Sequence, residues 1–259
     1  MAENQSAQRS DEWMPLTEHL GELRKRIIYC LIVFAVGLVG GLFGSQPVFD
    51  YLVDAAPEKN LDLHAFSPWD AIGLYMKFAF LISFVVAIPF AMFQLWLFVK
   101  PALGEKEQRA TLVFVPWALV MCLVGLAFSY FIVFPMAFLF TEKVTFNLGL
   151  EQTYGVSQYF SFLFNILLPI SLLFELPLVI LFLSRIGILS PALLVRMRKV
   201  AWFILIAIGV TVTPPDVVSD LLVAVPLVLL YEISVLLSKL AFGRRQRMLE
   251  REMAAMDEA

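Results

Sequence analysis

The chain has 259 residues, of which 60% are hydrophobic and only 16% are charged, and its mean hydropathy is +0.83. A soluble domain is about half apolar and about one quarter charged, so this composition excludes a disordered chain and indicates an integral membrane protein. The net charge of −3 argues against a nucleic-acid-binding protein. Only His19 and His64 could serve a histidine-based metal site, and Cys30 and Cys122 lie inside apolar runs, so we expect no metal and no cofactor.

Apolar runs long enough, or nearly long enough, to cross about 30 Å of hydrocarbon recur along the chain. They cover residues 27–43, 78–99, 110–140, 159–184, 200–212 and 217–238. The third run is longer than one crossing needs, so we expect it to tilt or protrude. The fifth reaches only about 20 Å, so we expect it to form a short helical hairpin with the sixth. We predict one all-α membrane domain with six transmembrane helices, and four spans plus a re-entrant hairpin is the alternative.

The distribution of positive charge predicts the orientation of these spans. If the chain crosses six times, sixteen of its nineteen lysines and arginines fall on one side, and the exceptions are Lys59, Lys77 and Lys143. Positive residues accumulate on the cytoplasmic side of membrane proteins. The N-terminal segment 1–26 and the charged tail 239–259 are therefore both predicted to be cytoplasmic.

Capping signals and prolines agree with this segmentation. Ser67-Pro68-Trp69-Asp70 predicts a helix start with an N-cap and an early acid, and Thr213-Pro214-Pro215-Asp216 repeats the pattern before the sixth run. Ser190-Pro191 predicts a helix that leads into the fifth run. Prolines within the runs predict kinked helices that form a concave groove, and they are Pro89, Pro116, Pro135, Pro169, Pro177 and Pro226.

Two acidic segments lie on the predicted cytoplasmic side. Residues 15–26 have leucine and isoleucine at 3–4 spacing, which predicts an amphipathic helix along the interface that runs into the first span. Within it Glu22 can pair with Arg26 one turn away. The loop 100–109 adds Glu105 and Glu107 on the same side. Such separated carboxylates suit the guanidinium fork of a cationic peptide, and the alternative is an ordinary solvated surface.

Two acids lie inside the spans. Glu175 is well inside the fourth run, where an ionisable group is costly and is expected to face a cavity or a partner. Glu232 lies nearer the cytoplasmic end of the sixth run, where it can snorkel or approach Lys239.

Together these segments resemble the TatC family, the polytopic core of the twin-arginine protein translocase. The resemblance covers about residues 13–245, and the order and spacing of its motifs make it specific. The motifs are Pro15–Arg26, Phe93–Leu103 with Glu107, Tyr130–Pro135, Phe174–Pro177 and Thr213–Asp216.

The resemblance implies a translocase subunit, not an enzyme, in the bacterial inner membrane. Such a subunit binds the twin-arginine signal peptides of folded precursor proteins at its cytoplasmic face, self-associates, and works with the proton-motive force. The family's signal-peptide site matches Glu22, Glu107, Arg24, Gln94 and Phe98. Its buried acid facing the groove matches Glu175. The hairpin tip that meets the single-span partners TatA and TatB matches Thr213, Asp216 and Asp220, although the family often has an uncharged polar residue at the last position.

Other functional classes fit the sequence less well. An intramembrane hydrolase needs a nucleophile with a base, or paired acids at one depth, and no such set is evident in the spans. A proton-coupled secondary transporter that uses Glu175 is the alternative function, but the chain has no internal repeat. No phosphate-binding loop is evident, so ATP hydrolysis by this chain is not expected.

Overall fold

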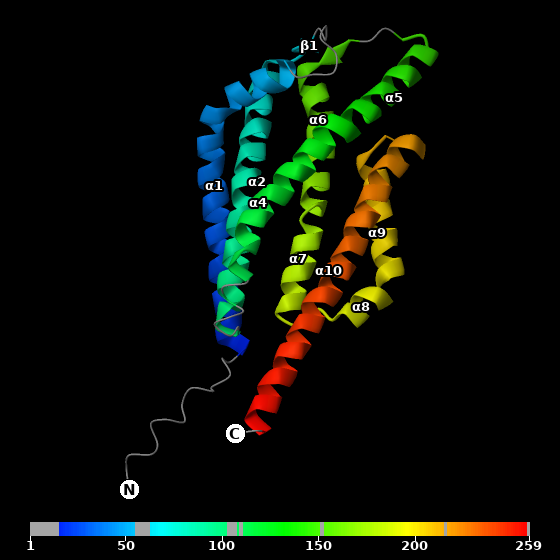
Figure 1. Cartoon of the computed structure of the whole chain (residues 1–259). Coiled ribbons are helices and arrows are strands. Elements are labelled where there is room, and N and C mark those ends of the chain that lie inside the picture. The colour runs from blue at the N-terminus through cyan, green and yellow to red at the C-terminus, as the bar shows by residue number, and fades with distance from the viewer. Residues whose placement is uncertain are drawn as a thin grey trace.

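The computed structural model describes residues 16–54, 63–102, 108, 111–150, 153–214 and 217–257. Long helices run up and down in an elongated bundle, and the first helix begins at the same end of the bundle as the last one finishes (Figure 1). The helices are α1 (Leu16–Asp54), α2 (Pro68–Val99), α4 (Phe114–Phe128), α5 (Phe134–Asn147), α6 (Val156–Leu173), α7 (Leu176–Arg185), α8 (Pro191–Arg196), α9 (Arg198–Val212) and α10 (Val217–Asp257).

Five stretches of the described residues are long and apolar enough to cross a membrane. They are Leu20–Asp54, Pro68–Val99, Phe114–Asn147, Val156–Arg185 and Asp220–Leu240. The all-α membrane fold expected from composition is therefore confirmed. The fifth predicted span corresponds to α9, whose 15 residues are too few to meet this length criterion. The predicted amphipathic segment runs directly into the first span, because α1 is one continuous helix.

A seam of small residues joins α1 to α2. A Cβ added at Gly41 would lie 2.7 Å from the carbonyl oxygen of Ala79, and one added at Gly37 would lie 2.7 Å from the hydroxyl of Ser83. The Ser45 hydroxyl lies 2.7 Å from Gly41 O in its own helix and 3.2 Å from Tyr75 O of α2. In lipid, where helices gain little from burying apolar surface against each other, such close backbone approach provides the packing energy.

The third span contains an irregular turn. A π-helical segment, Ser129–Val133, joins α4 to α5 directly before Pro135. Pro135 has no backbone N–H, so the regular helical hydrogen-bond pattern is interrupted at this point. In the wider π-helical turn the N–H of Phe134 donates to the carbonyl oxygen of Ser129, five residues earlier. The combined helix crosses the bundle diagonally relative to its neighbours (Figure 1). Tyr130 in this segment donates to Leu52 O and so ties α1 to the third span.

Aromatic rings fill the core between these helices. Phe78 of α2, Phe134 of α5 and Phe160 of α6 are almost completely buried and form edge-on or tilted ring pairs with their neighbours. A short parallel pairing of β1 (Leu63–His64) with β2 (Tyr154–Gly155) closes the end of the bundle away from the chain termini (Figure 1).

Two of the predicted helix caps are present. Ser67 forms a capping box with Asp70 at the start of α2, and the Ser190 hydroxyl accepts from Leu193 N at the start of α8, so both predictions are confirmed. The short α9 packs beside α10 (Figure 1). Glu232 of α10 pairs with Arg198 of α9 at 2.9 Å, so the expected approach to Lys239 is replaced by a contact between helices.

Candidate functional site

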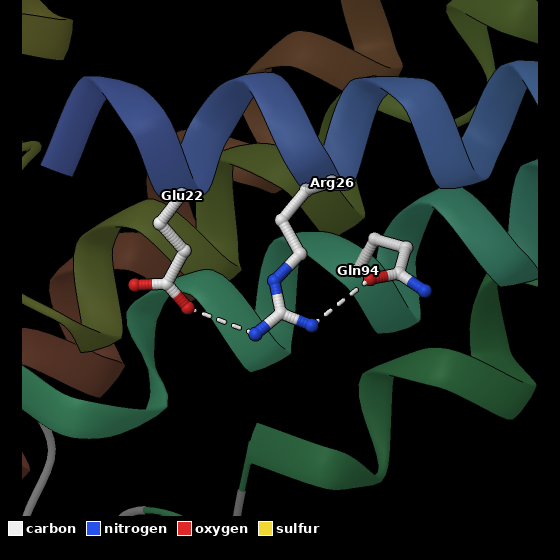
Figure 2. A network of polar contacts seen from close by, with 3 residues as sticks. All are labelled: Glu22, Arg26 and Gln94. Carbon is white, nitrogen blue, oxygen red and sulfur yellow. Dashed lines mark hydrogen bonds and ion pairs between the residues drawn. The ribbon is translucent and has the colours of Figure 1, made fainter. Parts of the chain in front are cut away.

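Three predicted or neighbouring polar residues meet where α1 and α2 lie side by side. The Arg26 guanidinium donates from Nη2 to Glu22 Oε1 at 2.8 Å and from Nη1 to Gln94 Oε1 at 3.2 Å. Figure 2 shows Arg26 between its two acceptors, with Glu22 on the same helix and Gln94 on the facing one. The predicted Glu22–Arg26 pair is therefore confirmed, and Gln94 joins it from α2.

The burial of these three side chains differs in a way that affects their chemistry. Gln94 is only 6% exposed, whereas the side chains of Glu22 and Arg26 are 24% and 23% exposed. A buried amide needs hydrogen-bond partners, and Arg26 satisfies its carbonyl oxygen. The charged pair keeps contact with the surroundings, so an ion pair of this kind contributes only about 0.3–1 kcal/mol. The network is therefore specific in geometry but can be opened at modest cost.

Two of the remaining predicted members of this site, Phe98 and Arg24, lie on α2 and α1 close to the network. Phe98 is half-buried one helical turn beyond Gln94, and therefore on the same face of α2. Arg24 is exposed on α1. Glu107 lies outside the described residues.

Both ends of the connection that carries Glu107 are held against α2. The Trp96 indole donates to the Thr111 hydroxyl at 3.0 Å, and the Lys100 ammonium lies 5.3 Å from the centroid of the Trp96 ring. The Gln108 amide donates to Lys100 O at 3.3 Å. The loop therefore starts and ends beside the last turn of α2, at the same end of the bundle as the start of α1 (Figure 1).

Glu175 occupies the break between α6 and α7. It is 6% exposed, and neither carboxylate oxygen has a hydrogen-bond partner among the described residues. Cys122 of α4 lies next to it. Close packing of α4 here depends on Gly125, because an added Cβ would lie 2.7 Å from the Ser171 Cα. A buried acid without a partner at this depth is costly, which makes it a candidate for function rather than for stability.

The hairpin tip contributes a second polar contact. Thr213 is buried, and its hydroxyl lies 2.9 Å from both Gly209 O and Asp220 Oδ1. Thr213 thus closes α9 and links it to α10, whereas the sequence motif predicted a role in starting the next helix. Thr213 also lines a hollow of about 620 Å³ between α5, α6 and α9, and Glu175 is not among its lining residues. Asp216 lies outside the described residues.

The predicted residues thus fall into three separate places: the α1–α2 network, the α6–α7 break and the hairpin tip. Sequence reasoning did not identify the bond from Arg26 to Gln94, since the two residues are 68 positions apart. It also missed Lys77, which lies inside α2 and reaches Ser157 and Ser161 of α6. An amide at position 94 in an otherwise apolar stretch was the available signal for the first contact.

Comparisons with known proteins agree with the arrangement of these motifs. Residues 18–226 match the family model described as Sec-independent protein translocase protein (TatC). The chain is 41% identical over 234 residues to the translocase protein TatCy of Bacillus subtilis, covering 90% of this chain and 92% of that protein. It is 34% identical to the TatC protein of Aquifex aeolicus, covering 90% and 98%. A crystal structure of the twin-arginine translocase receptor TatC in DDM superposes with a TM-score of 0.74 at 32% identity, covering 85% of this chain and 99% of that chain.

Proposed function

The chain belongs to the TatC family of Sec-independent protein translocase proteins, and from this premise we propose that its α1–α2 network is part of a receptor for twin-arginine signal peptides. It is a multi-pass membrane protein of that translocase. The receptor consists of Glu22, Gln94, Phe98 and Arg24, together with Glu107 of the following loop. It binds the signal peptides of folded precursor proteins at the cytoplasmic face.

The observation that carries this proposal is an arginine already accommodated between Glu22 and Gln94. Two separate guanidinium nitrogens reach two acceptors on two helices, at 2.8 and 3.2 Å. A peptide arginine offers the same planar fork of two nitrogens, whereas lysine carries all three of its donors on one nitrogen. Phe98 supplies an apolar surface one turn away, and Glu107 supplies a carboxylate for the second arginine of the peptide.

The orientation follows from the same charge argument as before. Both termini and the loop 103–107 face the cytoplasm, six crossings place them there, and the membrane is the bacterial inner membrane. The short α9 makes the fifth crossing, packed beside α10 in a locally thinner bilayer. The proton-motive force drives transport.

Two further places serve the assembled complex. Glu175 supports a polar groove within the membrane rather than a catalytic step. Thr213, Asp216 and Asp220 form the contact region for TatA- and TatB-type single-span subunits, where the hydrogen bond from Thr213 to Asp220 holds the tip of the hairpin in place. Self-association of the chain brings several such receptors together.

Photocrosslinking tests the receptor directly. A photoreactive phenylalanine analogue at Phe98 should crosslink a twin-arginine precursor in membrane vesicles, and the same analogue at Phe203, exposed on α9, is the matched control. Glu22→Gln or Glu107→Gln should each weaken the crosslink about tenfold, because a charged hydrogen bond contributes about 1.5–3 kcal/mol. A twin-lysine precursor that crosslinks from position 98 as well as the twin-arginine precursor would refute the proposal.

A further inference from the structure

We propose that Arg26 is an internal competitor for the signal peptide, whose guanidinium occupies in the resting protein the acceptors that a peptide arginine would use. Binding is then an exchange of one guanidinium for another. This inference rests on the proposed function of Glu22, which supplies the anionic acceptor, and it assigns to Arg26 a role of its own.

The contacts of Arg26 are those expected of a bound ligand. Its two terminal nitrogens reach acceptors on α1 and α2, and the facing acceptor, Gln94, is itself buried (Figure 2). The neighbouring cations differ from it, because Arg24 and Lys25 are exposed whereas Arg26 is half-buried. Arg26 is therefore the basic side chain of this turn that α1 directs into the seam.

Opening the network leaves two groups that need a new donor. Glu22 loses its cation, and the carbonyl oxygen of Gln94 loses its hydrogen bond inside the seam. A peptide arginine restores both contacts, so the free energy lost by displacing Arg26 is largely recovered. An uncharged peptide residue restores neither contact. Every ligand must displace the same two contacts, so selectivity for arginine arises from how completely the ligand restores them.

The size of the effect follows from the fraction of molecules in which Glu22 is available. A ligand that binds only this open fraction has an apparent Kd larger than its intrinsic Kd by the inverse of that fraction. The partly exposed Arg26–Glu22 pair and the hydrogen bond to Gln94 together lower the open fraction about three- to tenfold, compared with a protein that lacks both contacts. Removing Arg26 should therefore tighten peptide binding by about the same factor.

The test is the affinity of a labelled synthetic twin-arginine signal peptide for the purified full-length protein in detergent. Arg26→Met keeps a long aliphatic side chain but removes the donors, and it should tighten binding about three- to tenfold. Lys25→Met, which removes the same charge from the adjacent exposed position, should change binding less than twofold. Arg26→Lys keeps the charge but loses the planar two-nitrogen fork, so its affinity should lie between those of Arg26→Met and the unmodified protein. It serves as the test variant if Arg26→Met fails to fold.

Two further measurements separate this inference from the proposed function. Every ligand must first displace Arg26. Arg26→Met should therefore tighten the binding of a twin-lysine peptide by the same factor as the binding of the twin-arginine peptide. In a Glu22→Gln background the gain from Arg26→Met should shrink. If Glu22→Gln weakens binding but Arg26→Met fails to tighten it, or if Lys25→Met tightens it equally, the competitor role is wrong and the receptor stands. If Glu22→Gln leaves binding unchanged in the Arg26→Met background, where no internal guanidinium offsets the loss, the receptor proposal itself is wrong.

Discussion

An alanine at Gly41 should destabilise the protein, whereas an alanine at the adjacent Gly40 should not. The new Cβ at Gly41 would lie 2.7 Å from the carbonyl oxygen and 2.9 Å from the Cα of Ala79, which are backbone atoms that cannot move aside alone. At Gly40 no atom lies within 4 Å of the added Cβ. Overpacking of this kind costs about 1–3 kcal/mol. The intrinsic helix gain from glycine to alanine is the same at both sites, about 1 kcal/mol, so it cancels when the two variants are compared.

The assay is equilibrium unfolding of both variants in mixed detergent micelles with increasing sodium dodecyl sulfate, followed by circular dichroism. Gly41→Ala should unfold with a free energy about 1–3 kcal/mol lower than Gly40→Ala. Refolding on dilution checks that the transition is reversible, as the comparison requires. Equal unfolding free energies would mean that α1 and α2 can move apart at Gly41 without cost. Close backbone approach would then not be what stabilises this seam.

Three other predictions concern the remaining sites. Glu175→Ala should leave the protein inserted but impair transport in vesicles, and Glu175→Gln should be milder if hydrogen bonding matters more than charge; full transport by both would exclude a functional role. Thr213→Val should weaken crosslinking to single-span subunits, since it removes the hydrogen bond to Asp220, while unchanged crosslinking would argue against that contact region. A cysteine at exposed Arg196 should be labelled only from the cytoplasm and one at exposed Phe66 only from outside, and the reverse pattern would invert the topology.

Features set by neighbours in sequence could be predicted from the sequence alone. The capping box of Ser67 and Asp70 involves residues three positions apart, and the pair of Glu22 with Arg26 lies one helical turn apart. Such contacts depend only on the local helix, so spacing determines them. Long apolar stretches likewise predicted the five stretches that are long enough to span, because the bilayer imposes a minimum length on a helix.

Features that depend on which helices meet could not be predicted in the same way. From the sequence, Glu232 could snorkel or approach Lys239 on its own helix, but its carboxylate forms an ion pair with Arg198 and accepts from the Trp202 indole, both of α9. The π-helical turn before Pro135 is similar, because the proline predicts only that a hydrogen bond is lost, not how the backbone compensates. Both outcomes are decided by packing against neighbouring helices.

The contact between Arg26 and Gln94 follows the same pairing of α1 with α2 as the glycine seam. Along the seam Ser45 faces Tyr75, Gly41 faces Ala79 and Gly37 faces Ser83, so each step toward the start of α1 matches an equal step toward the end of α2. Eleven further residues along each helix, about 16 Å at 1.5 Å per residue, lead to Arg26 and Gln94. The seam therefore determines which residue of α2 faces Arg26. Because the α1–α2 network extends across two helices, small residues along the seam control the geometry of a site at the end of the bundle.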